Sequence, residues 1–357
     1  MGITSIELVD FRCYPAVTIE FGEGVTVVEG ANGHGKTSIL EAIVFASWGR
    51  SFRGAPDAAL VRNGAERAIA HVRGMFDGLG VAIDFEIPAS GRNTFVLNGK
   101  RVRRAALPSA LPVTVFGPDD LELLKGSPST RREFLDDLLV TLAPRYQAAR
   151  QDFERVLRQR NAALRQRADE ITLDVLDEQF VHAGAEVARG RERLAERITP
   201  LIAQAYQAVA NAPSSIRAAF HSEWMADGSP MEGQLRDAVA AARMRDLDRG
   251  VTTAGPHRDD WRVELDGMDA RMHASQGELR ALSLALRLAG HDVLKELTGR
   301  DPVILLDDVF SELDDARAKA LVQSLPQGQT LLTTASEPPE GMDIDHRIRV
   351  IDGTVIT

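Results

Sequence analysis

The sequence predicts an α/β protein in which a sheet-containing head is split by a mainly helical insertion that carries a short arm. Strand patterns and one glycine-rich loop fill the first 120 residues and return after residue 250, whereas long helical patterns fill the stretch between. A chain of 357 residues also has the length of about two domains. We therefore expect a head built from residues 1–120 and 250–357, and a helical insertion domain at residues 121–249.

The head is expected to begin with short strands that end in a glycine-rich turn. Apolar and polar residues alternate in β-rich runs at residues 3–9, 17–21 and 25–29, as they do in strands with one buried face. From Thr37 the apolar spacing becomes helical, and it stops at Gly49. The order strand, glycine-rich loop, helix is the first local signal of a ligand site.

More strands are expected before the insertion begins. Alternating or apolar runs predict them at residues 68–76, 81–87, 94–97, 100–102 and 113–116. The dipeptide Asn98-Gly99 is a hairpin-turn signal between two of these runs.

The insertion and the second part of the head follow. Helical patterns cover residues 131–142, 145–169 and 175–210, with Pro144, Pro200 and Pro213 as expected breaks or kinks. At ~1.5 Å per residue the second helix would be about 35 Å long, which makes a short arm and no extended coiled coil. Beyond residue 250 we expect strands at 261–265, 303–306 and 330–334 and a helix at 278–297.

Composition excludes several classes of protein. Cys13 is the only cysteine, so neither an internal disulfide nor a multi-cysteine zinc site is possible. No stretch approaches the ~20 apolar residues of a membrane-spanning helix, and the first residues lack the pattern of a secretory signal. We expect a cytoplasmic protein without a membrane partner. The net charge of −10 is uneven, because residues 50–104 carry ten basic against five acidic residues.

The glycine-rich loop matches the phosphate-binding pattern G-x-x-x-x-G-K-[ST]. Its residues are Gly30, Ala31, Asn32, Gly33, His34, Gly35, Lys36 and Thr37. Glycines let the backbone wrap phosphates, the following helix points its amides at them, Lys36 bridges the outer phosphates, and Thr37 places its hydroxyl on Mg²⁺. A glycine turn before an ordinary core helix is the alternative, but it leaves Lys36 unexplained.

A second signal is the buried strand at residues 303–306, which is followed by Asp307 and Asp308. Carboxylates at the tip of such a strand suit a Mg²⁺ site beside a triphosphate. We expect Asp307 to hold the metal, directly or through water, and Asp308 to polarise the attacking water. Alone, an apolar strand that ends in Asp is common; the phosphate loop gives it this meaning.

A third signal is the segment Ser275-Gln276-Gly277-Glu278, which precedes a long helix. Its hydroxyl, glycine amide and helix N-terminus form another anion-binding end. Because one triphosphate has little need of two such ends from one chain, we expect a head-to-tail homodimer, with Ser275 of one copy closing over the nucleotide held by Lys36 of the other. The segment from Ser311 to Asp314 would cross the same interface. A plain helix cap is the alternative reading of Ser275.

This order of motifs resembles the ABC-type ATPase heads of the SMC-like DNA repair proteins and, more narrowly, the RecF family. The segments that carry the closer resemblance are Asp10–Tyr14, Phe116–Pro128, Arg131–Asp136 and Thr253–Asp260. The resemblance runs from residue 3 to about residue 335. It implies ATP and Mg²⁺ as cofactors, with Arg12, Ser38, Gln276, Gly277 and Asp314 among the nucleotide contacts, and Lys36, Ser275 and Asp308 as the catalytic set.

Two departures from the wider ABC pattern affect the chemistry. Asp308 stands where most such ATPases carry Glu, so the attacking water must come closer or be reached indirectly, and we expect slow turnover. The strand at residues 330–334 ends without the usual switch histidine, which leaves Thr334 as the residue that could contact the terminal phosphate.

Two arginine-rich stretches are expected to meet DNA phosphates. The hairpin carries Arg92, Lys100, Arg101, Arg103 and Arg104 with no acidic residue between them. The arm helix carries Arg145, Arg150, Arg155, Arg158, Arg160, Arg165 and Arg167. Of these, Arg150, Arg158 and Arg165 lie near one helix face. Because aromatic residues make up only 5% of the chain, duplex DNA is favoured over stacked single strands. Ordinary solvated charge is the alternative for both stretches.

The resemblance implies an ATP-dependent DNA-binding ATPase of recombinational repair. Such proteins dimerise with ATP, bind duplex DNA and single/double-strand junctions at gaps, show weak DNA-stimulated ATPase activity, and act with RecR and RecO to load RecA. Two rivals stay open. The ATP-binding subunit of a membrane transporter shares the head but has a shorter helical lobe and no place for residues 118–136 or 255–260. A DNA scaffold that no longer hydrolyses ATP is the non-enzyme alternative.

Overall fold

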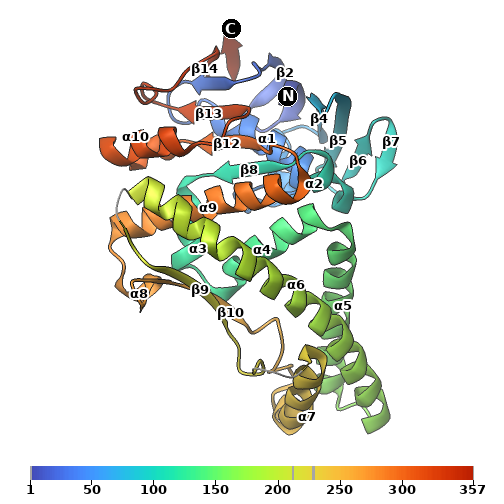
Figure 1. Cartoon of the computed structure of the whole chain (residues 1–357). Coiled ribbons are helices and arrows are strands. Elements are labelled where there is room, and N and C mark those ends of the chain that lie inside the picture. The colour runs from blue at the N-terminus through green and yellow to red at the C-terminus, as the bar shows by residue number, and fades with distance from the viewer. Residues whose placement is uncertain (1, 211–212, 227–229, 357) are drawn as a thin grey trace. The chain divides into compact units, whose positions relative to one another are not determined.

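The computed structural model describes residues 2–210, 213–226 and 230–356, which form two compact units (Figure 1). The first unit comprises Met1–Asp120, Gln204–Pro213 and Arg280–Thr357, and the second comprises Leu121–Ala203 and Ser214–Leu279. Segments from both ends of the chain therefore share one unit. The domain division that we expected at residue 250 stays a prediction. In the structure the chain passes from the second compact unit back to the first between Leu279 and Arg280.

The first unit contains a mostly parallel six-stranded sheet of order β15-β14-β3-β13-β12-β8. Its strands are β3 (Val25–Glu29), β8 (Val113–Phe116), β12 (Val303–Asp307), β13 (Thr330–Thr334), β14 (His346–Ile351) and β15 (Thr354–Ile356). In register, Asp307 lies beside Thr333, and Thr334 lies beside Glu29. The carboxyl ends of β3, β12 and β13 therefore meet at one edge of the sheet, where ligands bind in open α/β sheets.

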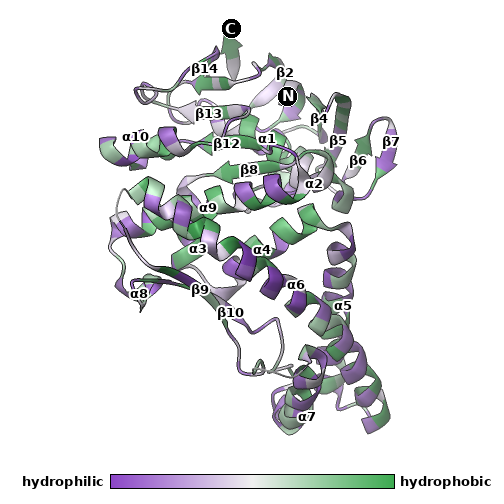
Figure 2. Ribbon diagram, viewed as in Figure 1, coloured by the Kyte–Doolittle hydropathy of each residue, from purple (hydrophilic) through white to green (hydrophobic). Residues whose placement is uncertain are grey.

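The two strands β8 and β12 are buried on both faces, which explains why apolar residues fill them apart from Thr114 and the terminal Asp307. Both are green in Figure 2, whereas β7, at the end of the other sheet of this unit, is purple. Buried strands give the carboxyl edge of this sheet a rigid base.

The second sheet of this unit is antiparallel, with the order β2-β1-β4-β5-β6-β7. Its strands are β1 (Gly2–Phe11), β2 (Tyr14–Glu20), β4 (Arg67–Phe76), β5 (Leu79–Pro88), β6 (Thr94–Leu97) and β7 (Lys100–Val102). Asn98 and Gly99 join β6 to β7 with φ angles of 48° and 76°. Two positive φ angles define the turn type that the Asn-Gly dipeptide favours.

Helix α1 (Lys36–Trp48) packs between the two sheets, in contact with β1, β4 and β5 on one side and β8, β12 and β13 on the other. Its residues Ile39, Leu40, Ile43 and Val44 are fully buried. A helix with sheets on both sides has no solvated face, so it is apolar all round rather than amphipathic. This packing fixes the start of α1, and with it the glycine-rich loop.

Helices and 3-10 turns complete the first unit. They are η1 (Asp57–Leu60), η2 (Arg104–Ala106), α2 (Leu107–Ala110), η4 (Val309–Glu312), α10 (Asp315–Ser324) and most of α9 (Gln276–Thr298); η3 (Pro118–Leu121) lies at the passage to the second unit.

The second unit is mainly helical with a small antiparallel sheet of order β11-β10-β9. Its elements are α3 (Glu122–Lys125), α4 (Pro128–Leu142), α5 (Pro144–Gln166), most of α6 (Glu170–Ala210), β9 (Ile216–His221), α7 (Met231–Arg249), β10 (Asp260–Leu265), β11 (Met268–Asp269) and α8 (Ala270–His273). Phe153, Phe180, Trp224 and Leu235 belong to its apolar core.

Most expected elements are present, and two expectations are wrong. Pro200 lies inside the 41-residue helix α6, as the expected helix at 175–210 allows. The expected helix at 145–169 ends at Gln166, where Arg167 turns into the left-handed region at φ 51°. Arg160, expected at the surface of the arm, is completely buried. Pro213 lies outside every helix.

In the part of the chain that the structure describes, no helix is both long and apolar enough to cross a membrane.

Candidate functional site

The glycine-rich loop joins β3 to α1 at the carboxyl edge of the parallel sheet, and two of its glycines are required by their surroundings. Gly30 has φ 159°, and a Cβ on it would lie 2.3 Å from the carbonyl oxygen of Val350. Gly35 has φ 107°, and a Cβ on it would lie 2.5 Å from Sγ of Cys13. Both the backbone angles and the space therefore exclude larger residues.

Lys36 is the first residue of α1 and its side chain folds back over the loop. Its Nζ donates hydrogen bonds to the carbonyl oxygens of Gly30 at 2.7 Å and Ala31 at 2.9 Å. Burial lowers the pKa of Lys36, while the nearby carboxylates of Asp308 and Asp307 raise it. The ammonium group thus sits at the mouth of the loop with neutral carbonyl partners that an anion can replace.

Asp307 ends β12 and lies against two hydroxyl groups. Its Oδ1 accepts hydrogen bonds from Thr37 Oγ1 and from Thr333 Oγ1, each at 2.8 Å. Burial raises the pKa of Asp307, and the two hydroxyls oppose that rise. The sequence placed Thr37 and Asp307 at one site, and in the structure they are in direct contact.

Asp308 follows with an unusual backbone conformation. Its φ is 50°, in the left-handed region, and its amide lies 3.1 Å from Oγ1 and 3.2 Å from the carbonyl oxygen of Thr333. Asp and Asn enter this region more readily than most side chains. The fixed backbone directs Asp308 to the same cavity as the loop. The hydroxyl of Thr334, by contrast, is bound to Ser336.

Lys36, Thr37 and Asp308 are among the residues that line a cavity of about 670 Å³ in the first unit. That size lies within the ~300–1,000 Å³ that ligand pockets usually occupy. From the sequence-predicted set it brings together Arg12, Asn32, Gly33, Gly35, Lys36, Thr37, Ser38 and Asp308. Sequence reasoning missed Arg53, Ala59, Val61 and Asn63, which also line it. Arg53 lies in the basic stretch from residue 50, and this charge excess was the available signal.

Arg12 enters the cavity from the turn after β1 and is held by a buried carboxylate. Its Nε and Nη2 donate to the two oxygens of Glu41 at 2.8 and 2.7 Å, and its Nη1 donates to the carbonyl of Ala59. Glu41 is fully buried on α1. A buried carboxylate needs such a bidentate partner, so Arg12 has a fixed orientation. Glu41 was missed because a single Glu in an apolar helix carries no pattern.

The C-terminal strands support the loop from the side of His34. His34 Nδ1 lies 3.4 Å from the carbonyl oxygen of Val350, and its Nε2 lies 3.4 Å from Asp352. The amide of Gly353 donates to the carbonyl of His34 at 3.1 Å. His34 is therefore a structural contact of the loop.

Ser275 and its neighbours belong to the second unit and form a helix-capping pattern. The amide of Ser275 donates to Glu278 Oε2 at 2.7 Å, and the amide of Glu278 lies 3.3 Å from Ser275 Oγ. This reciprocal pair is a capping box. Gln276, the first residue of α9, accepts through Oε1 from Lys125 Nζ at 2.9 Å, and Gly277 follows it in the helix. Ser275 is exposed.

Asp314, in the first unit, is also engaged locally. Its side chain caps α10 by accepting from the amide of Arg317 at 2.9 Å, and it pairs with the guanidinium of the same residue. These hydrogen bonds lower the pKa of Asp314. Ser311 donates to the carbonyl of Asp308 at 2.7 Å.

The basic hairpin is exposed as expected. Arg92, Lys100, Arg101 and Arg103 are all exposed, and Arg101 bonds to Thr94 on the neighbouring strand. Arg104 donates through its Nε to the carbonyl oxygen of Trp48 at 2.7 Å.

The arm helix has fewer unpaired arginines than its sequence indicates. Arg150 lies 3.1 Å from Glu154 and 3.5 Å from Asp136. The buried Arg160 pairs with Asp177 and Asp246 at 2.6 and 2.7 Å. Arg158 and Arg165 are exposed. Internal carboxylates thus neutralise two of the arginines that the pattern placed on the surface.

Comparisons with known proteins agree with one another. The model of the RecF/RecN/SMC N terminal domain matches residues 2–341. The DNA replication and repair protein RecF of Acidothermus cellulolyticus is 38% identical over an alignment of 368 positions, which covers 99% of this chain and 99% of its own. RecF of Frankia alni is 39% identical over 94% of this chain and 93% of its own.

Solved structures give the same result. The recombination mediator protein RecF with ATP, of the RecFOR pathway, is 28% identical and superposes with a TM-score of 0.93 over 99% of this chain and 97% of that one. An Smc head bound to the C-winged helix domain of ScpA matches with a TM-score of 0.59 at 20% identity, which shows a shared fold.

Proposed function

The chain belongs to the RecF family of DNA replication and repair proteins, which are ABC-type ATPases, and from this premise we propose that it is an ATP-dependent DNA-binding ATPase of recombinational repair. ATP joins two copies head to tail on duplex DNA or on single/double-strand junctions at gaps. Hydrolysis then separates the copies and releases the DNA. RecR, RecO and RecA are the proposed partners in this pathway.

One observation carries the proposal: the loop ammonium of Lys36 and the carboxylates of Asp307 and Asp308 meet at the carboxyl edge of one parallel sheet. An ordinary glycine turn would not bring a buried lysine between its own carbonyls and two carboxylates. Gly30 and Gly35 have no room for a Cβ, and because they carry none, the loop backbone stays open to phosphate oxygens.

The residues present fit a Mg²⁺ ion. Thr37 Oγ1 and Asp307 Oδ1 are 2.8 Å apart, and both are the oxygen ligands that Mg²⁺ prefers. No group of three or more metal-ligating side chains occurs among the described residues, as expected for an ion held by one carboxylate, one hydroxyl and phosphate oxygens. When bound, Mg²⁺ would neutralise charge on those oxygens.

The remaining roles follow from contacts of the chain itself. Lys36 exchanges its two carbonyl partners for phosphate oxygens. Asp308 orients the attacking water, with its backbone held by Thr333. Because Asp is one methylene shorter than the more usual Glu, its reach toward the water is shorter, and we expect slow turnover.

The second anion-binding end is the start of α9 at Ser275. Its exposed hydroxyl and the first amides of the helix suit the terminal phosphate bound by another copy. This arrangement makes ATP part of the interface, so binding energy from the triphosphate favours the dimer over separate copies.

The test is the mass in solution, measured by sedimentation with and without ATP. The parent protein should pair when ATP is present. Lys36→Met should lose nucleotide binding and pairing, whereas Ser275→Arg should bind ATP as a monomer and fail to pair, because its bulk blocks the partner's phosphate. A Ser275→Arg protein that still dimerises with ATP contradicts the composite site.

A further inference from the structure

The second unit contains a groove that the ATPase chemistry does not use. It has a volume of about 750 Å³ and lies between the end of α7, the end of β9 and the segment Thr253–Asp260. That segment is one of the stretches that carry the RecF resemblance, and the nucleotide site gives it no role. Four arginines line the groove: Arg245, Arg249, Arg258 and Arg262.

Three of these arginines have no carboxylate partner in the described part of the chain. Arg245 donates through Nε to the hydroxyl of Thr253 at 2.9 Å. Arg258 reaches the carbonyl oxygen of Thr252 at 3.4 Å. Arg249 ends α7, is exposed, and has neither an ion-pair nor a hydrogen-bond partner within the described ranges. Three guanidinium groups therefore keep donors available.

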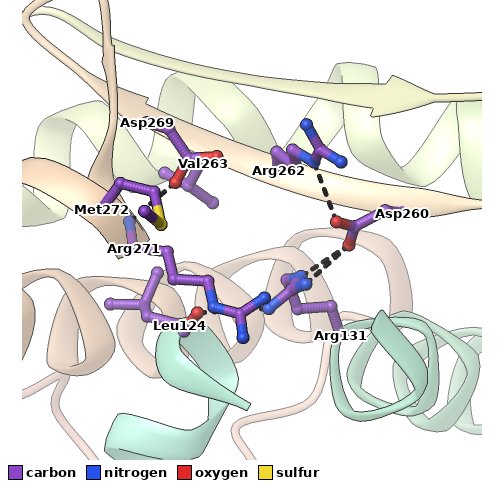
Figure 3. A pocket seen from close by; sticks show the side chains of 8 residues that line it. All are labelled: Leu124, Arg131, Asp260, Arg262, Val263, Asp269, Arg271 and Met272. Carbon is purple, nitrogen blue, oxygen red and sulfur yellow. Dashed lines mark hydrogen bonds and ion pairs between the residues drawn. The ribbon is translucent and has the colours of Figure 1, made fainter. Parts of the chain in front are cut away.

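The lining holds three carboxylates against its four arginines, and one of the three is shared with an arginine outside the groove. Figure 3 shows Asp260 between the guanidinium groups of Arg131 and Arg262, at 2.8 and 2.9 Å. Asp259 is buried and accepts from Trp224 Nε1 at 2.8 Å. Glu223 is the remaining carboxylate of the lining, and its charge can offset that of one arginine.

The segment that carries Arg258 is held rigidly. Asp246 accepts from both the amide and the hydroxyl of Thr253, and the buried Arg160 pairs with Asp246. Gly255 packs against the ring of Phe180, where a Cβ would lie 2.8 Å from Cζ. A fixed backbone lets a ligand bind without ordering the loop first.

We propose that this groove binds the phosphodiester backbone of DNA. The inference deepens the proposed function, on which it rests, by giving the DNA a site other than the basic hairpin and the arm. Guanidinium groups match phosphate oxygens in pairs and remain charged at every relevant pH. A protein partner would need several apolar anchors, whereas the two large apolar residues of the lining offer little: Trp224 is buried and bonded to Asp259, and Phe220 is only partly exposed.

The test compares two double variants with equal charge changes. Arg249→Gln/Arg258→Gln alters the groove, and Arg193→Gln/Arg217→Gln removes two exposed arginines of the same unit outside it. Affinity for a duplex is measured with ATP across a salt series. The groove variant should bind at least about tenfold more weakly, and its salt slope should fall by about two, roughly one for each phosphate that the groove no longer neutralises. The control should keep the parent's slope.

Glu223→Gln adds a test of opposite sign. Removal of this carboxylate should strengthen duplex binding, because it removes repulsion between the groove and phosphates. A groove variant with the parent's affinity and slope overturns the inference, and so does a groove that binds an acidic peptide while DNA affinity is unchanged. If the parent itself binds no duplex with ATP, the proposed function fails instead. Nucleotide binding by each variant checks that its first unit is intact.

Discussion

Asp259 is buried and His257 is partly buried in the same segment, and this burial moves their pKa values in opposite directions. It raises the pKa of Asp259 to about 6 and lowers that of His257 to about 4. The folded protein therefore holds a proton on Asp259 that the unfolded chain releases above its usual pKa of ~3.9. It also keeps His257 neutral at pH values below ~6.5, where the unfolded chain binds a proton on this residue.

The two groups oppose each other in their effect on stability. The contribution of Asp259 is fully present below about pH 4 and is lost as the pH rises through about 6. The contribution of His257 is present above about pH 6.5 and is lost as the pH falls toward 4. Between pH 4 and 6 their slopes partly cancel, so the parent protein alone does not reveal either group.

Asp259→Asn separates the two contributions. Asn keeps an acceptor for Trp224 Nε1 and cannot ionise. The free energy of unfolding of the variant, minus that of the parent, should therefore increase from pH 4 to pH 7, by at most about 3 kcal/mol for a shift of two pKa units. Denaturant unfolding at several pH values measures this difference. A difference that does not vary with pH contradicts the raised pKa of Asp259.

At the scale of elements, the C-terminal hairpin of β14 and β15 contacts the glycine-rich loop. Its turn at Gly353 has φ 72°, donates to the carbonyl of His34, and lies where a Cβ would be 3.0 Å from the carbonyl oxygen of Cys13. A side chain there would push the hairpin away from the phosphate loop.

Gly353→Val should therefore weaken nucleotide binding. The matched control is Gly341→Val, because Gly341 also has a positive φ of 89° but nothing within 4 Å of a Cβ. Both variants carry the backbone strain of a β-branched residue, of order 1–3 kcal/mol, and only the first adds a clash beside the loop. Calorimetric titration with ATP should give a several-fold weaker affinity for Gly353→Val alone. Equal losses in both would mean that the hairpin does not support the loop.

The sequence was sufficient for elements whose pattern is local. The strands β1 and β3, the loop and α1 follow from alternation, glycines and helical spacing, and the Asn98-Gly99 turn follows from its dipeptide. The residue patterns did not predict β9, α7, α10, β14 or β15. In α7 the buried Leu235, Val239, Ala242 and Asp246 do have helical spacing, but alanines and charges on the other faces hide the stripe.

The sequence was less sufficient for side chains whose role depends on distant partners. Lys36, Thr37 and Asp307 follow from their motifs. Charge counting placed Arg160 at the surface, whereas Asp177 and Asp246, from other helices, bury it as an ion pair. Glu41 could not be predicted as the partner of Arg12 for the same reason. Ion pairs between segments that are far apart in the sequence produce no periodic pattern in it.

At the scale of the whole molecule, the proposed cycle depends on the lifetime of the ATP-bound dimer. In this proposal binding and hydrolysis draw on different residues: Lys36 and Thr37 would hold the nucleotide, whereas Asp308 would act on water. A variant that loses only hydrolysis should therefore remain closed on DNA for longer, and this separates an ATPase from a scaffold that never hydrolyses ATP.

Asp308→Asn makes that separation without disturbing the fold. Asn tolerates the left-handed backbone at φ 50° as well as Asp does, but it cannot orient water as a carboxylate. Phosphate release should fall by at least about 100-fold, the usual share of a general base. The ATP-bound dimer and its DNA complex should then dissociate more slowly. Asp266→Asn, at an exposed turn with φ 52°, is the matched control and should behave as the parent. Equal background rates of phosphate release in the parent and Asp308→Asn would favour the scaffold, because Asp308 would then have no water to activate.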